Sequence, residues 1–197
     1  MKEKLTVKTL ITAACLGTML SACSGMKGAS SAEKRELKAD IVSSSGVSMG
    51  TVTFSSGEGG VTIDANIKGL VPAGTFHGIH IHHANNAAGG TACVAPTFAS
   101  AGAHLSTAGN VHGKHTGDLP VLLALNDGTA RYYSVTDRFT LADLAGAAVI
   151  VHALADNYNN VPRGSKPDQY TPNSADAIKL TDDTGNAGDR IGCGVIK

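Results

Sequence analysis

Alternating apolar and polar residues mark the first part of the chain as strand-forming. Residues 50–54 and 60–67 place an apolar side chain at nearly every second position, which is typical of strands with one buried face. The segment between them, 55–60, reads SSGEGG, a composition typical of turns. We therefore predict a hairpin built from these two strands.

The second half of the chain shows the same kind of pattern. The run 120–125, the turn sequence Asn126-Asp127-Gly128 and the run 129–135 predict a second hairpin. The more continuous apolar run 147–153 predicts a buried strand. Helical periodicity is weak throughout, and only 140–144 predicts a single helical turn. The pattern as a whole predicts an all-β domain.

Two long segments, 84–119 and 154–190, show no regular pattern. Both are far longer than ordinary connections between strands. Loops of this length in a compact domain are usually functional. We therefore expect the two segments to carry the functional residues.

The N-terminal residues predict export. Three lysines precede an apolar stretch from Leu10 to Leu20, which is too short for a bilayer-spanning helix, so we interpret 1–22 as a signal peptide. The sequence Leu20-Ser21-Ala22-Cys23 resembles the lipobox of bacterial lipoproteins. Lipid on Cys23 would anchor the protein on the extracytoplasmic side of a membrane, in the periplasm or at the cell surface. A plain signal peptide is the alternative.

The rest of the chain divides into a tether and one domain. Residues 23–38 are mostly Ser, Ala, Gly, Lys and Glu, which predicts a flexible tether. Residues 39–197 are long enough for one domain with a full core. The formal net charge of the chain is zero, which argues against nucleic acid as a partner.

The cysteine count predicts one disulfide bond. Cys15 would leave with the signal peptide and Cys23 would carry lipid, so Cys93 and Cys193 remain. An even number of cysteines in an exported protein indicates a disulfide. Two separate buried thiols are the alternative.

Histidines gather in a way that predicts metal binding. Four of the eight histidines lie in the segment 77–83, HGIHIHH. On a strand, His80 and His82 point to the same face, and two such imidazoles can hold copper, zinc or iron. Further candidates lie on or beside the long segments: His104, His112, His115, Asp118 and His152.

Several motifs resemble the copper/zinc superoxide dismutases, and the resemblance runs from the strand at 50–52 to the C-terminus. The matching segments are 78–82, 101–104, 115–120, 151–152 with Asp156-Asn157 behind it, and 184–196. The last segment is the most specific, because its order of glycine, arginine and cysteine has no generic explanation.

The resemblance implies a flattened Greek-key β-barrel with two long functional loops, and it assigns the site residues. Copper would bind His80, His82, His104 and His152. Zinc would bind His104, His112, His115 and Asp118. The catalytic residues would be His104, which bridges the metals and carries a proton, and Arg190, which docks the anion. Asp156 would hydrogen-bond a copper histidine and a zinc histidine, and Cys93 would pair with Cys193.

Three features of the histidine segments need separate interpretation. Only Gly113 and Lys114 separate His112 from His115, a shorter spacing than the family usually has. Some actinobacterial members with a similar loop lack zinc, although a turn can bring residues i and i+3 together around a tetrahedral ion. We expect His77 to make a structural hydrogen bond. We expect His83, which faces away from His80 and His82, to be solvated or to cap a loop.

The function implied is that of a superoxide dismutase, an oxidoreductase that converts superoxide to oxygen and hydrogen peroxide by cycling copper between Cu(II) and Cu(I). The protein would act as a monomer or homodimer, with superoxide as substrate and a membrane as its anchor. The alternatives are a non-catalytic copper-binding or copper-delivery lipoprotein on the same fold and a structural or adhesive domain that binds zinc only. The presence of all four copper histidines and the arginine favours the enzyme.

Overall fold

The computed structural model describes residues 35–83, 93–106, 110–160 and 175–197. Its strands are β1 (Glu36–Ser43), β2 (Ser48–Gly57), β3 (Gly60–Ile67), β4 (Phe76–His77), β5 (Ile79–His83), β6 (Ala103–His104), β7 (Leu122–Leu123), β8 (Ala130–Thr136), β9 (Ala148–His152) and β10 (Arg190–Val195). Its helices are the 3₁₀ turns η1 (Ala99–Ala101) and η2 (Leu141–Leu144) and the α-helix α1 (Ala175–Thr184).

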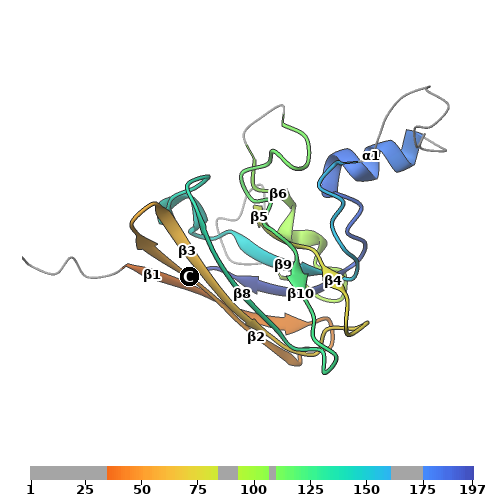
Figure 1. The fold of residues 1–197 in the computed structure, drawn as a ribbon, viewed down its shortest axis with the longest axis horizontal. Coiled ribbons are helices and arrows are strands. Elements are labelled where there is room, and N and C mark those ends of the chain that lie inside the picture. Colours follow the sequence, from red (N-terminus) through yellow and green to blue (C-terminus); the bar gives the residue numbers. More distant parts are fainter. Residues whose placement is uncertain (1–34, 84–92, 107–109, 161–174) are drawn as a thin grey trace, which may run out of the picture. The chain divides into compact units, whose positions relative to one another are not determined.

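Eight strands form one antiparallel sheet in the order β6-β5-β9-β10-β1-β2-β3-β8 (Figure 1). β4 pairs with β7 separately. The strands alternate as predicted: in β3, Val61, Ile63, Ala65 and Ile67 are buried. The all-β prediction is therefore confirmed.

The inner face of the sheet encloses a single main core. Ile41 and Ile63 from one half of the sheet belong to the same buried cluster as Ile79 and Ile81 of β5. Residues near opposite ends of the strand order can share a core only if the sheet curls around it. The curl brings β5 and β9, which carry the histidines, onto the same framework as β1 to β3.

The first predicted hairpin is correct and the second is wrong. β2 and β3 pair along their whole length, with Gly57 opposite Gly60. The Asn126-Asp127-Gly128 turn also forms, since Leu125 N donates to Thr129 O at 2.7 Å. However, β7 pairs with β4 and β8 pairs with β3. Burial of the flanking strands in the curled sheet therefore determines their partners.

The short elements η1 and β6 lie within the segment 84–119, where no regular structure is predicted. β1 and α1 also differ from the prediction, because polar residues obscure their patterns. β1 begins at Glu36, inside the predicted tether 23–38, because Leu37, Ala39 and Ile41 face inward between charged residues. The helix α1 lies in the segment predicted to be without structure. Polar residues interrupt the apolar ones in its sequence, and its Leu180 side chain is exposed. η2 confirms the helical turn predicted at 140–144.

The disulfide predicted between Cys93 and Cys193 is present, so the alternative of two separate thiols is wrong. It attaches the segment 93–104 to β10, beside a second small core formed by Phe98, Ala101, Ala148, Ile150 and Cys193. The segment that leads to His104 is therefore fixed to the sheet.

The N-terminal predictions concern residues outside the described part. The predicted signal peptide 1–22, the predicted lipidation site Cys23 and the predicted tether as far as residue 34 all lie there. Among the described residues, no helix is both long and apolar enough to cross a membrane.

Candidate metal centre

Strand parity places the first two histidines. Ile79 and Ile81 of β5 face the main core, so His80 and His82 point together to the other face, and both are fully buried. β9 runs beside β5, with His80 opposite Ile150. β6 lies on the other edge, where His104 is opposite His82. His152 ends β9, so three neighbouring strands bring these imidazoles together.

The four imidazoles expected to bind copper form one buried group: His80, His82, His104 and His152. Ring centroids are 4.2 Å apart for His80 and His104, 4.7 Å for His80 and His152, and 4.6 Å for His82 and His104. These spacings allow all four to reach one ion.

The residues expected to bind zinc form a second buried group that shares His104 with the first: His104, His112, His115 and Asp118. Asp118 organises the turn internally, because its Oδ2 accepts from Gly113 N at 2.6 Å and from His115 N at 2.9 Å. Its other oxygen, Oδ1, is left to face the imidazoles. The short spacing between His112 and His115 therefore still yields a convergent set.

In the first group, the rings of His80, His82 and His152 are each oriented by a contact of one ring nitrogen. His80 Nε2 lies 2.6 Å from Asp156 Oδ2, and His82 Nδ1 lies 2.9 Å from the carbonyl oxygen of Gly102. His152 Nδ1 lies 3.1 Å from the carbonyl oxygen of Gly188. Such contacts fix the tautomer, so the other nitrogen presents a lone pair to the centre.

The nitrogens that face the centre have no hydrogen-bond partner. Among the described residues, the buried atoms without one are Tyr132 Oη and five histidine nitrogens: His80 Nδ1, His82 Nε2, His104 Nε2, His112 Nδ1 and His152 Nε2. Burying an unpaired polar atom is costly. Four of these nitrogens, on His80, His82, His104 and His152, belong to the first group and converge on one place, where their lone pairs fit a set of metal ligands.

The second group also fits a tetrahedral ion. A Zn–N bond of about 2.0–2.1 Å gives tetrahedral ligand separations of about 3.3–3.4 Å. His115 Nδ1 lies 3.3 Å from both His104 Nδ1 and Asp118 Oδ1, and His112 Nδ1 lies 3.2 Å from Asp118 Oδ1. His104 Nδ1 and Asp118 Oδ1 are closer, at 2.7 Å, where they form a hydrogen bond.

Asp156 connects the two groups. Its carboxylate accepts from His80 Nε2 at 2.6 Å and from His112 Nε2 at 2.7 Å, and also from Tyr158 N at 2.6 Å. Gly185, which has a φ of 62° and follows α1, lies against this bridge. A side chain at Gly185 would collide with Asp156 Oδ1 and His112 Nε2, so only glycine fits there.

Electrostatics favour neutral imidazoles in the first group. Burial lowers the pKa of His82 well below its ordinary value, that of His104 to about 4 and that of His152 to about 3. His112 differs: burial acts to lower its pKa, but the carboxylates of Asp118 and Asp156 outweigh this effect and raise the pKa to about 9. A metal ion at His112 would therefore displace a proton.

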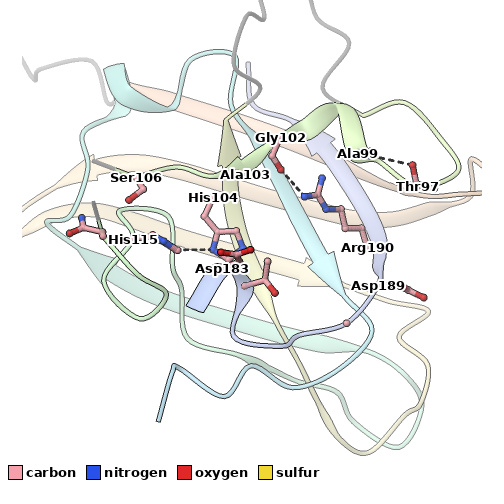
Figure 2. A pocket seen from close by; sticks show the side chains of 13 residues that line it. Thr97, Ala99, Gly102, Ala103, His104, Ser106, His115, Asp183, Asp189 and Arg190 are labelled. Carbon is pink, nitrogen blue, oxygen red and sulfur yellow. Dashed lines mark hydrogen bonds between the residues drawn. The ribbon is translucent and has the colours of Figure 1, made fainter. Parts of the chain in front are cut away.

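Arg190 lies at the entrance to the centre. Its guanidinium donates to the carbonyl oxygens of Phe98 and Gly102, both at 2.7 Å. Figure 2 shows the side chain reaching from β10 toward Gly102, on the wall that also carries His104. Arg190, His104 and His115 line a cavity of about 880 Å³, so a small anion can reach both the arginine and the imidazoles.

The two remaining histidines behave as expected. His77 is buried, with Nδ1 at 2.8 Å from the carbonyl oxygen of His152 and Nε2 at 3.0 Å from that of Pro72. It is therefore a structural residue that supports the end of β9. His83 is exposed.

Sequence reasoning missed several groups that shape the centre. The Gly102 carbonyl serves both His82 and Arg190, and the Asp182 carbonyl of α1 accepts from His112 N at 2.7 Å. Backbone carbonyls have no sequence signature. Gly185 could have been noticed, since it lies within the C-terminal motif 184–196 and such glycines end helices.

Comparison with known proteins agrees with this geometry. Residues 48–196 match the family described as copper/zinc superoxide dismutase (SODC). The protein named superoxide dismutase [Cu-Zn] from Mycobacterium tuberculosis is 40% identical over 157 residues, covering 73% of this chain and 61% of its own length. The protein of that name from Caulobacter vibrioides is 33% identical over 168 residues, covering 77% and 80%.

Solved structures show the same fold. A superoxide dismutase-like protein from Bacillus subtilis matches with a TM-score of 0.58 and 26% identity, covering 80% of this chain and 95% of that one. The Cu/Zn superoxide dismutase from Brucella abortus matches with a TM-score of 0.61 over 83% and 100% of the two chains, and at 24% identity it supports the fold alone.

The chain belongs to the copper/zinc superoxide dismutase family, and its fold is the Greek-key barrel of that family. Membership implies copper and zinc as the metals, for which the two histidine groups are suited. The disulfide and the bacterial family together indicate a location outside the cytoplasm. The chain spans 65% of the length of the relative from Mycolicibacterium paratuberculosis and 61% of that from Mycobacterium tuberculosis.

Proposed function

We propose that this protein is a superoxide dismutase. Two superoxide anions and two protons would yield one oxygen and one hydrogen peroxide. The observation that carries the proposal is the convergence of unpartnered nitrogens from His80, His82, His104 and His152 beside the guanidinium of Arg190. The names of the relatives from Mycobacterium tuberculosis and Caulobacter vibrioides support the same activity.

The proposed roles follow from the contacts of each residue. Copper would be held by His80, His82, His104 and His152, and zinc by His104, His112, His115 and Asp118. Bound copper would supply one-electron redox chemistry, and bound zinc would keep the turn 112–118 in place.

The chain's own groups would handle the anion and the proton. The Arg190 guanidinium, held by two carbonyl oxygens at 2.7 Å, would attract superoxide and orient it toward the imidazoles. His104 Nε2 faces the centre without a partner, so it would hold a proton there and deliver it to the product. Asp156 would keep the His80 and His112 tautomers fixed.

Inhibition of superoxide-driven dye reduction by the metal-loaded protein would test the activity. We expect His104→Ala to abolish turnover, and Arg190→Ala to slow it strongly while copper stays bound. Arg131→Ala is a matched control, because Arg131 is an exposed cation on β8 whose ion pair is with Asp64. If the metal-loaded protein scavenges superoxide no faster than the metal-free protein, the assignment is wrong and copper carriage without turnover replaces it.

We also propose that residues 1–22 are removed and that Cys23 carries lipid, which would anchor the enzyme to a membrane from its outer side. The support is the sequence before Cys23, with small residues after an apolar stretch. Labelling with a radioactive fatty acid should mark the wild type and not Cys23→Ser. Equal labelling of the two proteins, or none of either, would contradict the lipid anchor.

A further inference from the structure

Arg138 lies outside the metal-binding residues but contacts the turn that carries three of them. Its Nη1 donates to the carbonyl oxygens of His115 at 3.2 Å and Asp118 at 3.3 Å. Its Nη2 donates to the carbonyl oxygen of Gly113 at 3.4 Å. One guanidinium therefore contacts three peptide groups of the turn 112–118.

The backbone of Arg138 is itself anchored to the barrel. The next residue, Phe139, is buried in the main core, where its ring packs edge-on against Phe54 with centroids 6.5 Å apart. Arg138 N donates to Thr136 Oγ1, at the end of β8, at 3.2 Å. The side chain thus links a rigid part of the sheet to the turn.

The turn needs this external support because its internal bonds are few. Asp118 Oδ2 accepts from Gly113 N and His115 N, which organises the turn through a side chain that must also present Oδ1 to an ion. Gly113 has a φ of 85° and lies against the carbonyl oxygen of Tyr158. One backbone hydrogen bond lies within the turn 112–118, from Asp118 N to His115 O at 3.2 Å, and a second, from Lys114 N to Val111 O at 3.0 Å, lies at its start.

We infer that Arg138 is a positioning residue for the second metal group, holding the peptide groups on both sides of His115 so that the turn is already shaped for an ion. The inference rests on the proposed zinc role of His112, His115 and Asp118. A guanidinium suits the task because its planar fork can serve several carbonyl oxygens at once, whereas a lysine ammonium is a single point charge.

The test is zinc affinity of the full chain with its disulfide intact, measured by competition with a chelating dye, together with the visible spectrum of bound Co(II). We expect Arg138→Ala to bind zinc about tenfold or more weakly, as is usual when an outer-shell partner is removed, and to alter the Co(II) bands. Arg138→Lys should recover little of the loss.

Two controls distinguish a positioning role of Arg138 from an effect of its charge or from a general loss of structure. Arg131→Ala removes an exposed cation that pairs with Asp64 at the start of β8 and should leave zinc affinity within about twofold. Added guanidinium ion should partly restore zinc binding to Arg138→Ala, because the arginine lines a cavity of about 260 Å³. Copper binding by His80, His82 and His152 should not change.

The possible results point to different errors. Wild-type protein that binds neither zinc nor Co(II) at this group would refute the proposed zinc role. Wild-type binding with no loss in Arg138→Ala, or an equal loss in Arg131→Ala, would refute the role of Arg138 alone. If Arg138→Ala does not fold, Arg138→Gln provides the same comparison with a side chain of similar shape.

Discussion

Replacing both cysteines of the disulfide, in the variant Cys93→Ala with Cys193→Ala, should destabilise the metal-free protein strongly. The two residues are 100 positions apart in the sequence, so in the unfolded chain the bond closes a loop that contains most of the domain. Alanine is the appropriate replacement, because Cys193 is fully buried and packs in the second core.

The expected magnitude follows from the loop length. Closing a loop of roughly 100 residues lowers the free energy of the folded state relative to the unfolded one by about 4.7 kcal/mol in the chain-entropy treatment. Domains of this size lose about 2–4 °C of melting temperature per kcal/mol. We therefore expect the melting temperature to fall by about 10–20 °C.

Urea unfolding measures the difference in unfolding free energy between wild type and variant. The metal-free protein is used because bound metals would add their own stabilisation. The dependence of the unfolding free energy on urea should also become steeper, because the unfolded variant is less compact. Wild-type protein reduced before the measurement is the internal control and should match the double variant.

A loss of less than about 1 kcal/mol, with reduced wild type equally stable, would refute the reasoning. It would mean that the second core of Phe98, Ala101 and Ile150 holds the segment 93–104 without the covalent bond. Retained stability in the double variant with a destabilised reduced wild type would instead indicate an effect of the buried thiol groups.

Three further predictions concern the centre itself. Asp156→Asn should weaken metal binding by about 10–100-fold, because the amide has one accepting oxygen, whereas Oδ2 of the carboxylate accepts from His80 and His112 and Oδ1 accepts from Tyr158 N. Competition titration of zinc and copper measures this, and unchanged affinity would contradict it. Metal-free protein should be most stable near pH 6.5. Because folding raises the pKa of His112 to about 9, its protonation stabilises the folded state, and this stabilisation is lost as the pH rises from 6.5 through 9. Because folding lowers the pKa of His104 to about 4 and that of His152 to about 3, protonation of these two histidines in the unfolded state destabilises the folded state as the pH falls below 6.5. Urea midpoints across this pH range test it, and a flat profile would be inconsistent with the shifts. Gly185→Ala should reduce zinc affinity by at least about tenfold, because the new methyl group would collide with Asp156 and His112, and an unchanged zinc titration would show that the bridge can move.

Sequence patterning predicted those parts of the fold that depend on local alternation. β2, β3 and β9 lie where an inward apolar residue occurs at every second position or in a continuous run. β1 and α1 were missed because charged side chains interrupt their patterns. The wrong partner for β8 has a different cause, since pairing over long sequence distances depends on the whole curled sheet and a favourable turn cannot specify it.

The side chains of the candidate site could be predicted from the sequence, but the backbone groups that orient them could not. The chemistry of imidazole, carboxylate and guanidinium can be recognised in sequence, and the structure brings the predicted residues His80, His82, His104 and His152 together. The groups that orient them are often carbonyl oxygens, such as that of Gly102. Their positions depend on the path of the chain, so they became visible only in three dimensions.

The alternation within β5 makes one strand serve both the core and the metal centre. Ile79 and Ile81 fill the core on one face, while His80 and His82 face the centre on the other. A slip of one residue would exchange isoleucines and imidazoles, burying polar rings in the core and leaving the centre without its nitrogens. A misaligned strand would therefore lose metal affinity together with stability, so that capture of an ion selects molecules whose sheet has assembled in the correct register.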